Sequence, residues 1–337
     1  MNKKITIIIP CLNEEQYISE CLNSIIITDY PNEFLEVIVV DGISIDNTRK
    51  IIQKYIDRFH FIKLIDNIKK TPPTAMNLGI KIAKGDYICR LDAHAKYPSN
   101  YLSILLKYSE QLNAQNVGAV CITDVKNKNF KSNSIKKVLS HKLGVGNSDF
   151  RIGVSEIKDV DTVPFGFYKK EVFSKYGLYD ERLIRNQDIE LNRRIKNNGG
   201  KIYLIPEVKC TYFARENFIN LAKNNFNNGK WNILTAYYTQ TLRSLSLRHF
   251  IPLLYVLSLI IPMLLSMLVY NKMIFISIFL FLLHFLVICF VSYKINDKST
   301  SILNLIKSFY TLHFSYGLGS LKGIVDVIFK IIKKEKN

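Results

Sequence analysis

The chain has 337 residues, with 46 Lys and Arg against 28 Asp and Glu, so its formal net charge is +18. A hydrophobic content of 48% excludes a mostly disordered basic protein. The six cysteines form no CxxC pair, which argues against a zinc ribbon or a disulfide-stapled module and indicates reduced thiols. A mean hydropathy of +0.07 in so basic a chain implies that some long segment is strongly apolar.

The N-terminal half of the chain alternates between strand and helix patterns. The sequence predicts strands over 5–9, 35–40, 61–65 and 87–91, and helices over 13–27, 48–59 and 74–83. The run LEVIVV is apolar apart from Glu36, which is typical of a strand that is buried on both faces of a parallel sheet. The order predicts an α/β fold with a Rossmann-like, doubly wound and mostly parallel sheet.

Polar clusters follow three of these predicted strands, at 10–15, 41–46 and 92–94. A single Asp after a strand is ordinary turn chemistry. In a doubly wound sheet, however, ligands bind at the carboxyl ends of the strands, so three such clusters together favour a binding site.

Asp92 and His94 are two residues apart at the end of a predicted strand. In an extended backbone their side chains would point the same way and could hold one divalent cation, Mg²⁺ or Mn²⁺, together with phosphate oxygens. The alternative is a turn aspartate beside a surface histidine.

Asp188 lies near the start of a predicted helix that Gly199 and Gly200 end. The electropositive helix terminus would stabilise its carboxylate, which could then act as a general base on an alcohol. Its spacing fits a helix cap equally well. Trp231, the only tryptophan, is open to two interpretations as well: an anchor in the membrane interface or a stacking platform for a sugar ring.

The apolar excess lies near the C-terminus. Residues 250–270 and 273–293 carry no charge, and each run is close to the roughly 20 residues that span a bilayer as a helix. They predict a transmembrane helical hairpin. The segment 301–337 contains charges and three glycines and is interpreted as an amphipathic or re-entrant helix with a basic tail.

Basic residues gather over 126–142 and 209–249, and the second stretch leads directly into the predicted hairpin. Anionic lipid explains this position better than nucleic acid, since no nucleic-acid recognition motif accompanies it. Positive flanks favour the cytoplasmic side of the membrane.

Several motifs occur together, in order: IPCLNEEQYI, VDGISIDNT, TAMNLGIKIAKGDYICRLDAHA, FGFYKKEVF, YGLYDERLIRNQDIELNRRI and NNGKW. Over about residues 5–235 the chain resembles the family 2 glycosyltransferases of the GT-A fold. The LDAHA variant and the hairpin are similar to succinoglycan-type bacterial enzymes, which extend lipid-linked exopolysaccharide units. The expected organisation is a GT-A catalytic domain (1–215), a basic membrane-interface or acceptor segment (216–249), two transmembrane helices (250–293) and the last segment (301–337).

The resemblance also implies roles for single residues, most of them around a nucleotide-sugar donor. Those expected to bind this donor are Pro10, Asn13, Glu14, Asp41, Ser44, Asp46, Asn77 and Asp92. Asp92 and His94 fill the DxD positions that hold the metal, Mg²⁺ or Mn²⁺. Asp188 matches the catalytic base.

The residues expected at the acceptor and its diphosphate are Asn227, Lys230 and Trp231. Three departures from the family pattern concern charge. His94 replaces an Asp, Gln187 replaces the acidic residue before the base, and Lys230 replaces an Arg that could contact phosphate in a bidentate manner.

The function so implied is inverting transfer of a sugar from a nucleotide sugar, expected to be UDP-linked, to a polyprenyl-diphosphate-linked glycan in cell-surface polysaccharide synthesis. The protein is expected to be a multi-pass protein of the inner or plasma membrane, with its catalytic domain on the cytoplasmic side. Membrane lipids are expected partners, and nucleic acid is not. The alternatives are a polyprenyl-phosphate sugar synthase, a processive synthase and a catalytically inactive membrane-tethered binding protein.

Overall fold

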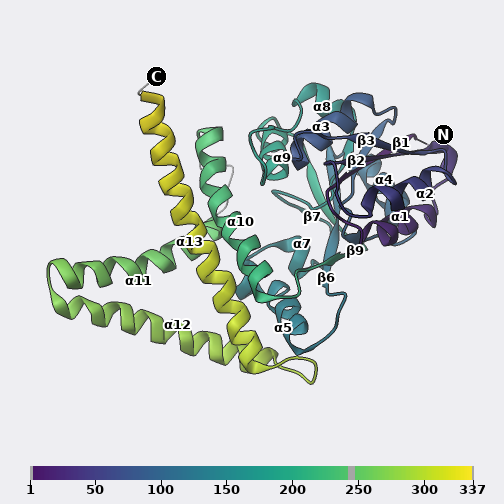
Figure 1. The fold of residues 1–337 in the computed structure, drawn as a ribbon. Helices are drawn as coiled ribbons and strands as arrows, with labels where there is room; N and C mark the ends of the chain where they lie inside the picture. The colour runs from purple at the N-terminus through teal and green to yellow at the C-terminus, as the bar shows by residue number, and fades with distance from the viewer. Residues whose placement is uncertain (1–2, 242–246, 336–337) are drawn as a thin grey trace. The chain divides into compact units, whose positions relative to one another are not determined.

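The computed structural model describes residues 3–241 and 247–335. The chain divides into two compact units (Figure 1). The first contains the chain up to Thr123 together with Asp149–Phe213, and the second contains Asp124–Ser148 together with the chain from Ala214 onward. The expected catalytic domain (1–215) includes 124–148, whereas in the structure this segment belongs to the same compact unit as the C-terminal helices.

One mixed sheet forms the centre of the first unit, and the described residues contribute nine strands to it. Its order is β3-β2-β1-β4-β8-β6-β9-β5, with β7 paired to β9. The parallel strands are β1 (Ile5–Cys11), β2 (Leu35–Asp41), β3 (Ile62–Asp66) and β4 (Tyr87–Arg90). The others are β5 (Ala95–Lys96), β6 (Asn116–Asp124), β7 (Lys158–Asp159), β8 (Phe167–Lys169) and β9 (Ile202–Phe213).

Helices cover both faces of this sheet, because alternate residues of its buried strands point to opposite sides. Ile7 packs in one core with α1 (Ile18–Ile26) and α4 (Tyr101–Gln111), whereas its neighbour Ile8 packs in the other with α3 (Pro72–Ile82). The remaining helical segments of the unit are α2 (Thr48–Ile56), α7 (Asp149–Ile152), α8 (Glu171–Lys175), α9 (Gln187–Asn197) and the short η1 (Asn32–Phe34). The predicted doubly wound α/β fold is confirmed.

The largest local difference from the sequence-based prediction lies at 13–17. The predicted helix over 13–27 begins only at Ile18. Asn13 has φ of 55°, a left-handed conformation that a helix interior does not adopt, and its side chain and backbone bond to the loop after β2. The loop contacts therefore outweigh the helical pattern of the first five residues.

The second unit is helical. Its elements are α5 (Phe130–Leu139), α6 (Lys142–Val145), α10 (Phe218–Thr239), η3 (Leu247–His249), α11 (Ile251–Leu268), η4 (Asn271–Met273), α12 (Ile274–Ile295) and α13 (Ile302–Glu335). Among the described residues, two helices are long and apolar enough to cross a membrane, and they are the two arms of the predicted hairpin. A hydrogen bond of 2.7 Å from Ser277 Oγ to the carbonyl of Leu259 joins these arms.

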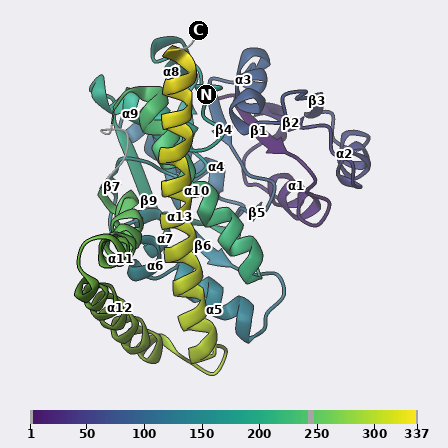
Figure 2. The same cartoon turned by 60° about the vertical axis from the view of Figure 1, so that its left-hand side comes forward.

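The segment predicted as amphipathic or re-entrant is one continuous helix, α13, which lies beside α10 in both Figure 1 and Figure 2. Glycines allow the close approach. A Cβ on Gly229 would lie 2.0 Å from the carbonyl oxygen of Tyr316, and one on Gly319 would lie 1.9 Å from that of Phe226. The two helices run parallel, since Lys307 stacks on Phe218 and, further along, Lys330 stacks on Tyr238.

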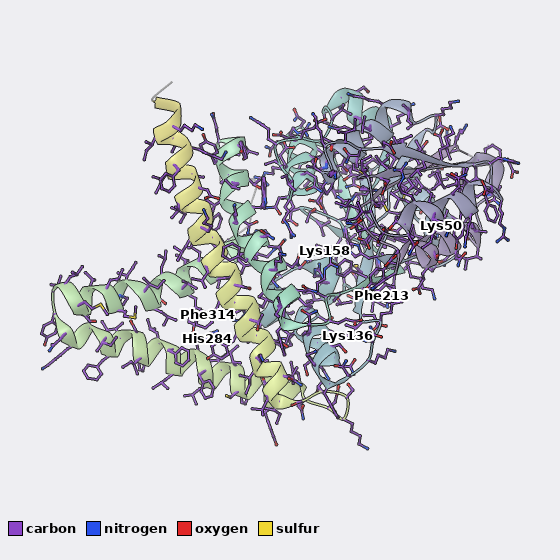
Figure 3. All side chains as sticks on the ribbon, in the orientation of Figure 1. Lys50, Lys136, Lys158, Phe213, His284 and Phe314 are labelled. Atoms are coloured by element: carbon purple, nitrogen blue, oxygen red, sulfur yellow. The ribbon has the colours of Figure 1, made fainter. Side chains whose placement is uncertain are left out.

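Helix α13 also supports the base of the hairpin. Ile288 of α12 and Phe309 of α13 share a small core with Val138 of α5. Nearby, His284 contacts His313 through ring nitrogens 3.1 Å apart, and His284 and Phe314, both labelled in Figure 3, each pack against the ring of Tyr255. These contacts tie the apolar hairpin to the rest of the helical unit.

Candidate active site

The polar clusters that follow β1, β2 and β4 lie at one edge of the sheet. In the order β3-β2-β1-β4 the chain winds in opposite directions on the two sides of β1, so the topological switch point, where sheets of this kind bind ligands, lies at the carboxyl ends of β1 and β4. The backbone of Gly42 donates to Cys11 (2.8 Å) and that of Leu91 donates to Ile8 (3.0 Å), which keeps the three strand ends in register.

Asp41 ends β2 and is fully buried. Its Oδ2 accepts from the backbone of Ser44 at 2.9 Å and from Arg49 Nη1 at 2.7 Å, and the same Arg49 nitrogen contacts Asp66 at 2.7 Å. The Ser44 hydroxyl donates to the other carboxylate oxygen of Asp41. This network holds a buried carboxylate at the carboxyl end of β2 and includes Arg49, an arginine that could not be selected from the sequence.

The loop after β1 interlocks with the loop after β2. The backbone N–H of Asn13 donates to Ser44 Oγ (2.8 Å), and that of Glu14 donates to Thr48 Oγ1 (2.7 Å). Asp46 accepts from the backbone of Thr48 (3.0 Å). Although its slight burial acts in the opposite direction, hydrogen bonds from Thr48 and from the backbone of Glu15 hold the pKa of Asp46 below its usual value. Pro10 lies in β1 opposite Val40, just before this interlock.

The expected geometry of Asp92 and His94 is wrong in one respect: they lie in a tight turn after β4, and not in an extended strand. Contacts across the site orient His94 instead. Its Nδ1 lies 3.2 Å from Oε1 of Glu14, and the rings of Tyr17 and Tyr212 meet it edge-on, with centroids 6.4 Å and 5.2 Å away. Figure 3 labels Phe213, which ends β9 and stacks on Tyr17.

Arg90 is a second arginine at the candidate site that could not be selected from the sequence. It is almost fully buried, and its Nε and Nη2 contact Asp92 Oδ1 at 3.2 and 3.1 Å. Its Nη1 lies 4.0 Å from Oδ2 of Asp188. Burial alone would lower the pKa of Arg90, but the charges of Asp92 and Asp188 more than offset this and raise it. Its place two residues before Asp92 was the available signal.

Asp188 is the second residue of α9 and is about a third exposed. Its Oδ1 accepts from the backbone of Ile189 at 2.9 Å, while Oδ2 faces Arg90. Asn186, with φ of 62°, turns the chain into the helix. The structure therefore brings the predicted base together with Asp92 through one shared guanidinium.

Asn77 is buried in α3, and its amide is used for structure. It donates to the carbonyl of Tyr179 at 2.9 Å and accepts from the backbone of the same residue at 3.0 Å. These bonds fix Tyr179, whose buried hydroxyl is close enough to Arg90 and Asp188 to interact with both charges. Burial raises the pKa of Tyr179 to about 12, so this phenol is neutral.

Asn227, Lys230 and Trp231 lie on α10, in the second unit. Lys230 Nζ pairs with Asp326 Oδ2 of α13 at 2.8 Å, and Lys322 contacts the same carboxylate. The predicted segment 216–249 is thus largely a helix packed on α13, while 242–246 lie outside the described residues.

Asp92 and His94 fit a divalent cation bound together with a nucleotide. Arg90 occupies only Oδ1 of Asp92, and Glu14 occupies only Nδ1 of His94, so Oδ2 and Nε2 are left as one oxygen and one nitrogen donor. No group of three or more such side chains is arranged around a metal position in the part of the chain that the structure describes. The other ligands would therefore be phosphate oxygens and water.

An open hollow of about 830 Å³ lies elsewhere, at the opposite end of β4. Gly85, Asp86 and Tyr87 line it together with several lysines. Because it adjoins the start of the strand and not its carboxyl end, it is unrelated to the Asp92 group.

The family profile described as Glycosyl transferase family 2 matches residues 6–177, half of the chain. The chain therefore belongs to this family and is a glycosyltransferase. Inversion at the anomeric carbon fits the family.

Two named relatives carry this further. A dolichyl N-acetyl-alpha-D-glucosaminyl phosphate 3-beta-D-2,3-diacetamido-2,3-dideoxy-beta-D-glucuronosyltransferase of Methanococcus voltae is 29% identical over 231 residues, which cover 67% of this chain and 71% of the relative. The succinoglycan biosynthesis protein ExoA of Rhizobium meliloti is 28% identical over 226 residues, covering 66% and 67%. The chain is thus similar to enzymes named for lipid-linked or polysaccharide acceptors.

Solved structures confirm the GT-A fold. A mannosyltransferase of Pyrobaculum calidifontis, in complex with GDP-Man and Mn²⁺, superposes with a TM-score of 0.60 at 14% identity, covering 97% of this chain and 88% of that one. TarS 1–349 of S. aureus, in complex with UDP-GlcNAc, gives a TM-score of 0.52 at 16% identity, covering 96% and 92%.

Proposed function

We propose that the protein transfers a sugar from a nucleotide-diphosphate sugar, with UDP as the expected nucleotide, to a lipid-linked saccharide, with inversion. The arrangement of Asp92, Arg90 and Asp188 is the observation that carries this proposal. The Asp188 carboxylate, at the start of α9, lies near the turn that we propose binds a cation. Both are at the carboxyl ends of the strands, where sheets of this kind bind nucleotides.

The donor would occupy the crevice between β1 and β4. Asp41, held by Ser44 and Arg49, would contact the uridine or its ribose, while Asn13 and Asp46 keep the two loops together. Asn77 would act through Tyr179, which it fixes. Asp92 and His94 would hold Mg²⁺ or Mn²⁺, which supplies positive charge to the departing diphosphate.

Asp188 would act as the general base. Its carboxylate takes the proton from an acceptor hydroxyl, whose oxygen bonds to the anomeric carbon as the bond to the diphosphate oxygen breaks. Attack from the opposite face turns an α-linked donor into a β-glycoside. The family relatives named for lipid-linked and polysaccharide acceptors support this acceptor class.

The apolar hairpin supports a membrane location with the catalytic unit on the cytoplasmic side, where a soluble donor meets a lipid acceptor. Exposed apolar side chains extend along both arms, among them Leu264 and Met267 on α11 and Phe279 and Leu286 on α12. We propose that these arms insert into the bilayer. Carbonate extraction of membranes that contain the full chain should leave it in the membrane fraction.

The decisive experiment replaces Asp188 with Asn and measures transfer from radiolabelled UDP-sugars to lipid extracts. We expect transfer to fall by about 10² or more while binding of UDP is unchanged. Asp57→Asn, on an exposed carboxylate after α2, is the matched control. Near wild-type transfer by the Asp188 variant would remove Asp188 as the base, and nucleotide binding without any transfer by the wild type would favour the inactive binding protein.

A further inference from the structure

Arg151 is a cation that the donor and base assignments leave unused. It lies on α7, which directly follows the segment Asp124–Ser148 of the second unit, and its side chain is half-buried. Its guanidinium carbon lies 5.5 Å from the ring centre of Phe150 and 5.2 Å from that of Tyr212.

This environment differs from that of four other arginines in the same unit. Carboxylates pair with Arg49, Arg90, Arg182 and Arg194. Among the described residues, no carboxylate pairs with Arg151, and its contacts are aromatic faces. Rings stabilise and orient a guanidinium through cation–π contact but leave its N–H edge free for an anion.

Tyr212 connects Arg151 to the metal-binding turn. The ring of Tyr212 also contacts His94 edge-on, with the centroids 5.2 Å apart, so one ring separates the free guanidinium from a proposed cation ligand. Tyr212 belongs to β9, whereas Asp41 and Ser44 follow β2, and in the sheet order these strands lie on opposite sides of β4. Arg151 therefore approaches the Asp92–His94 turn from the side away from the proposed nucleotide pocket.

We propose that Arg151 binds the phosphate or diphosphate of the acceptor lipid. The inference rests on the proposed function and assigns one of its substrates a partner. A planar guanidinium donates two parallel hydrogen bonds to phosphate, which a lysine does not. This assignment replaces the expectation from the sequence that Lys230 contacts the acceptor diphosphate, because the Lys230 ammonium already pairs with Asp326.

The test uses the full chain in detergent micelles, with farnesyl diphosphate as the acceptor probe and farnesol as the probe without phosphate. Binding of each is measured by titration calorimetry, and UDP with Mn²⁺ is titrated separately. We expect the wild type to bind farnesyl diphosphate and not farnesol. Arg151→Gln should weaken binding of farnesyl diphosphate at least tenfold, Arg151→Lys should weaken it severalfold, and both should bind UDP within twofold of the wild type.

Arg58→Gln is the matched control, because Arg58 also stacks on a neighbouring ring, that of Phe59, but lies at the end of α2. This variant should bind farnesyl diphosphate as the wild type does. Three results would overturn the proposal: no binding of farnesyl diphosphate by the wild type, equal binding by Arg151→Gln, or an equal loss of UDP binding in Arg151→Gln. If the wild type binds farnesyl diphosphate and UDP but transfers no sugar, the proposed function fails and the role of Arg151 in phosphate binding stands.

Discussion

His94 and Glu14 are 80 residues apart in the chain, yet Nδ1 of the first lies 3.2 Å from Oε1 of the second. Because a carboxylate accepts hydrogen bonds, this contact favours the His94 tautomer with its proton on Nδ1, and that tautomer keeps Nε2 as a metal donor. A loop that the sequence assigns to the nucleotide thus also orients a proposed metal ligand.

We expect Glu14→Ala to weaken Mn²⁺ binding in the presence of UDP by 10- to 100-fold, the usual effect of removing a partner that orients a metal-binding histidine. Electron paramagnetic resonance of free Mn²⁺ measures this directly. Glu15→Ala is the control, because Glu15 bonds to Asn47 and not to His94. Equal Mn²⁺ affinity in the two variants would contradict this role of Glu14.

Arg90→Lys tests whether the forked contact matters beyond its charge. A single ammonium cannot reproduce the bonds of Nε and Nη2 to Asp92 while also facing Asp188, so kcat should fall at least about tenfold. Affinity for UDP without metal should change by less than about threefold. Arg194→Lys removes a comparable, partly buried forked contact, that of Arg194 with Glu190, away from the site. A comparable fall of kcat there would indicate a general loss of rigidity.

The glycine contacts between α10 and α13 make a prediction about stability. Gly319→Ala would place a methyl group against the backbone of Phe226, and overpacking of this kind costs about 1–3 kcal/mol. Thermal unfolding in detergent should show a lower Tm. Leu318→Ala, at an exposed neighbouring position, should change stability by only about 0.5 kcal/mol.

Glu36 provides a test of pH dependence. Burial opposes its ionisation, but hydrogen bonds from the backbone of Lys84 (2.8 Å), from Thr6 (2.7 Å) and from Lys63 (3.0 Å) hold its pKa below the ordinary 4.5. Because the folded pKa is depressed, the stabilisation is complete above pH 4.5 and is lost as the pH falls through the folded value. Glu36→Gln should therefore be less stable than the wild type at pH 7, by about 1–3 kcal/mol, and this gap should narrow in acid. Urea unfolding at several pH values measures it.

The sequence predicted the parallel half of the sheet because its strands are apolar on both faces, as in Leu35–Asp41, where all seven residues are buried. The hairpin could be predicted equally well, since the length and the lack of charge of an apolar run are read from that segment alone. Glycines over 317–323 were visible but not interpretable, because their partner, α10, carries no apolar stripe that points to α13.

The candidate site could be predicted only in part, because it depends on contacts between residues that are far apart in the chain. Asp92 and Asp188 could be selected from motifs, but the guanidinium between them contacts two carboxylates that are 96 positions apart in the chain. Arg151 could not be selected from the sequence, because its proposed role depends on the rings of Phe150 and Tyr212 and on the missing carboxylate. Spacing cannot show which charges remain unpaired after folding.

The parallel arrangement of α10 and α13 gives the apolar hairpin a second duty. Two parallel neighbours cannot be joined by a short turn, since the chain must return along the full length of the first helix, about 33 Å for the 22 residues of α10. The chain between α10 and α13, residues 240–301, makes this return. The apolar hairpin is therefore also part of the connection between the two helices that support it. A soluble version made by excising α11 and α12 would need a replacement linker of at least about ten extended residues, and a shorter one would pull the two helices out of register.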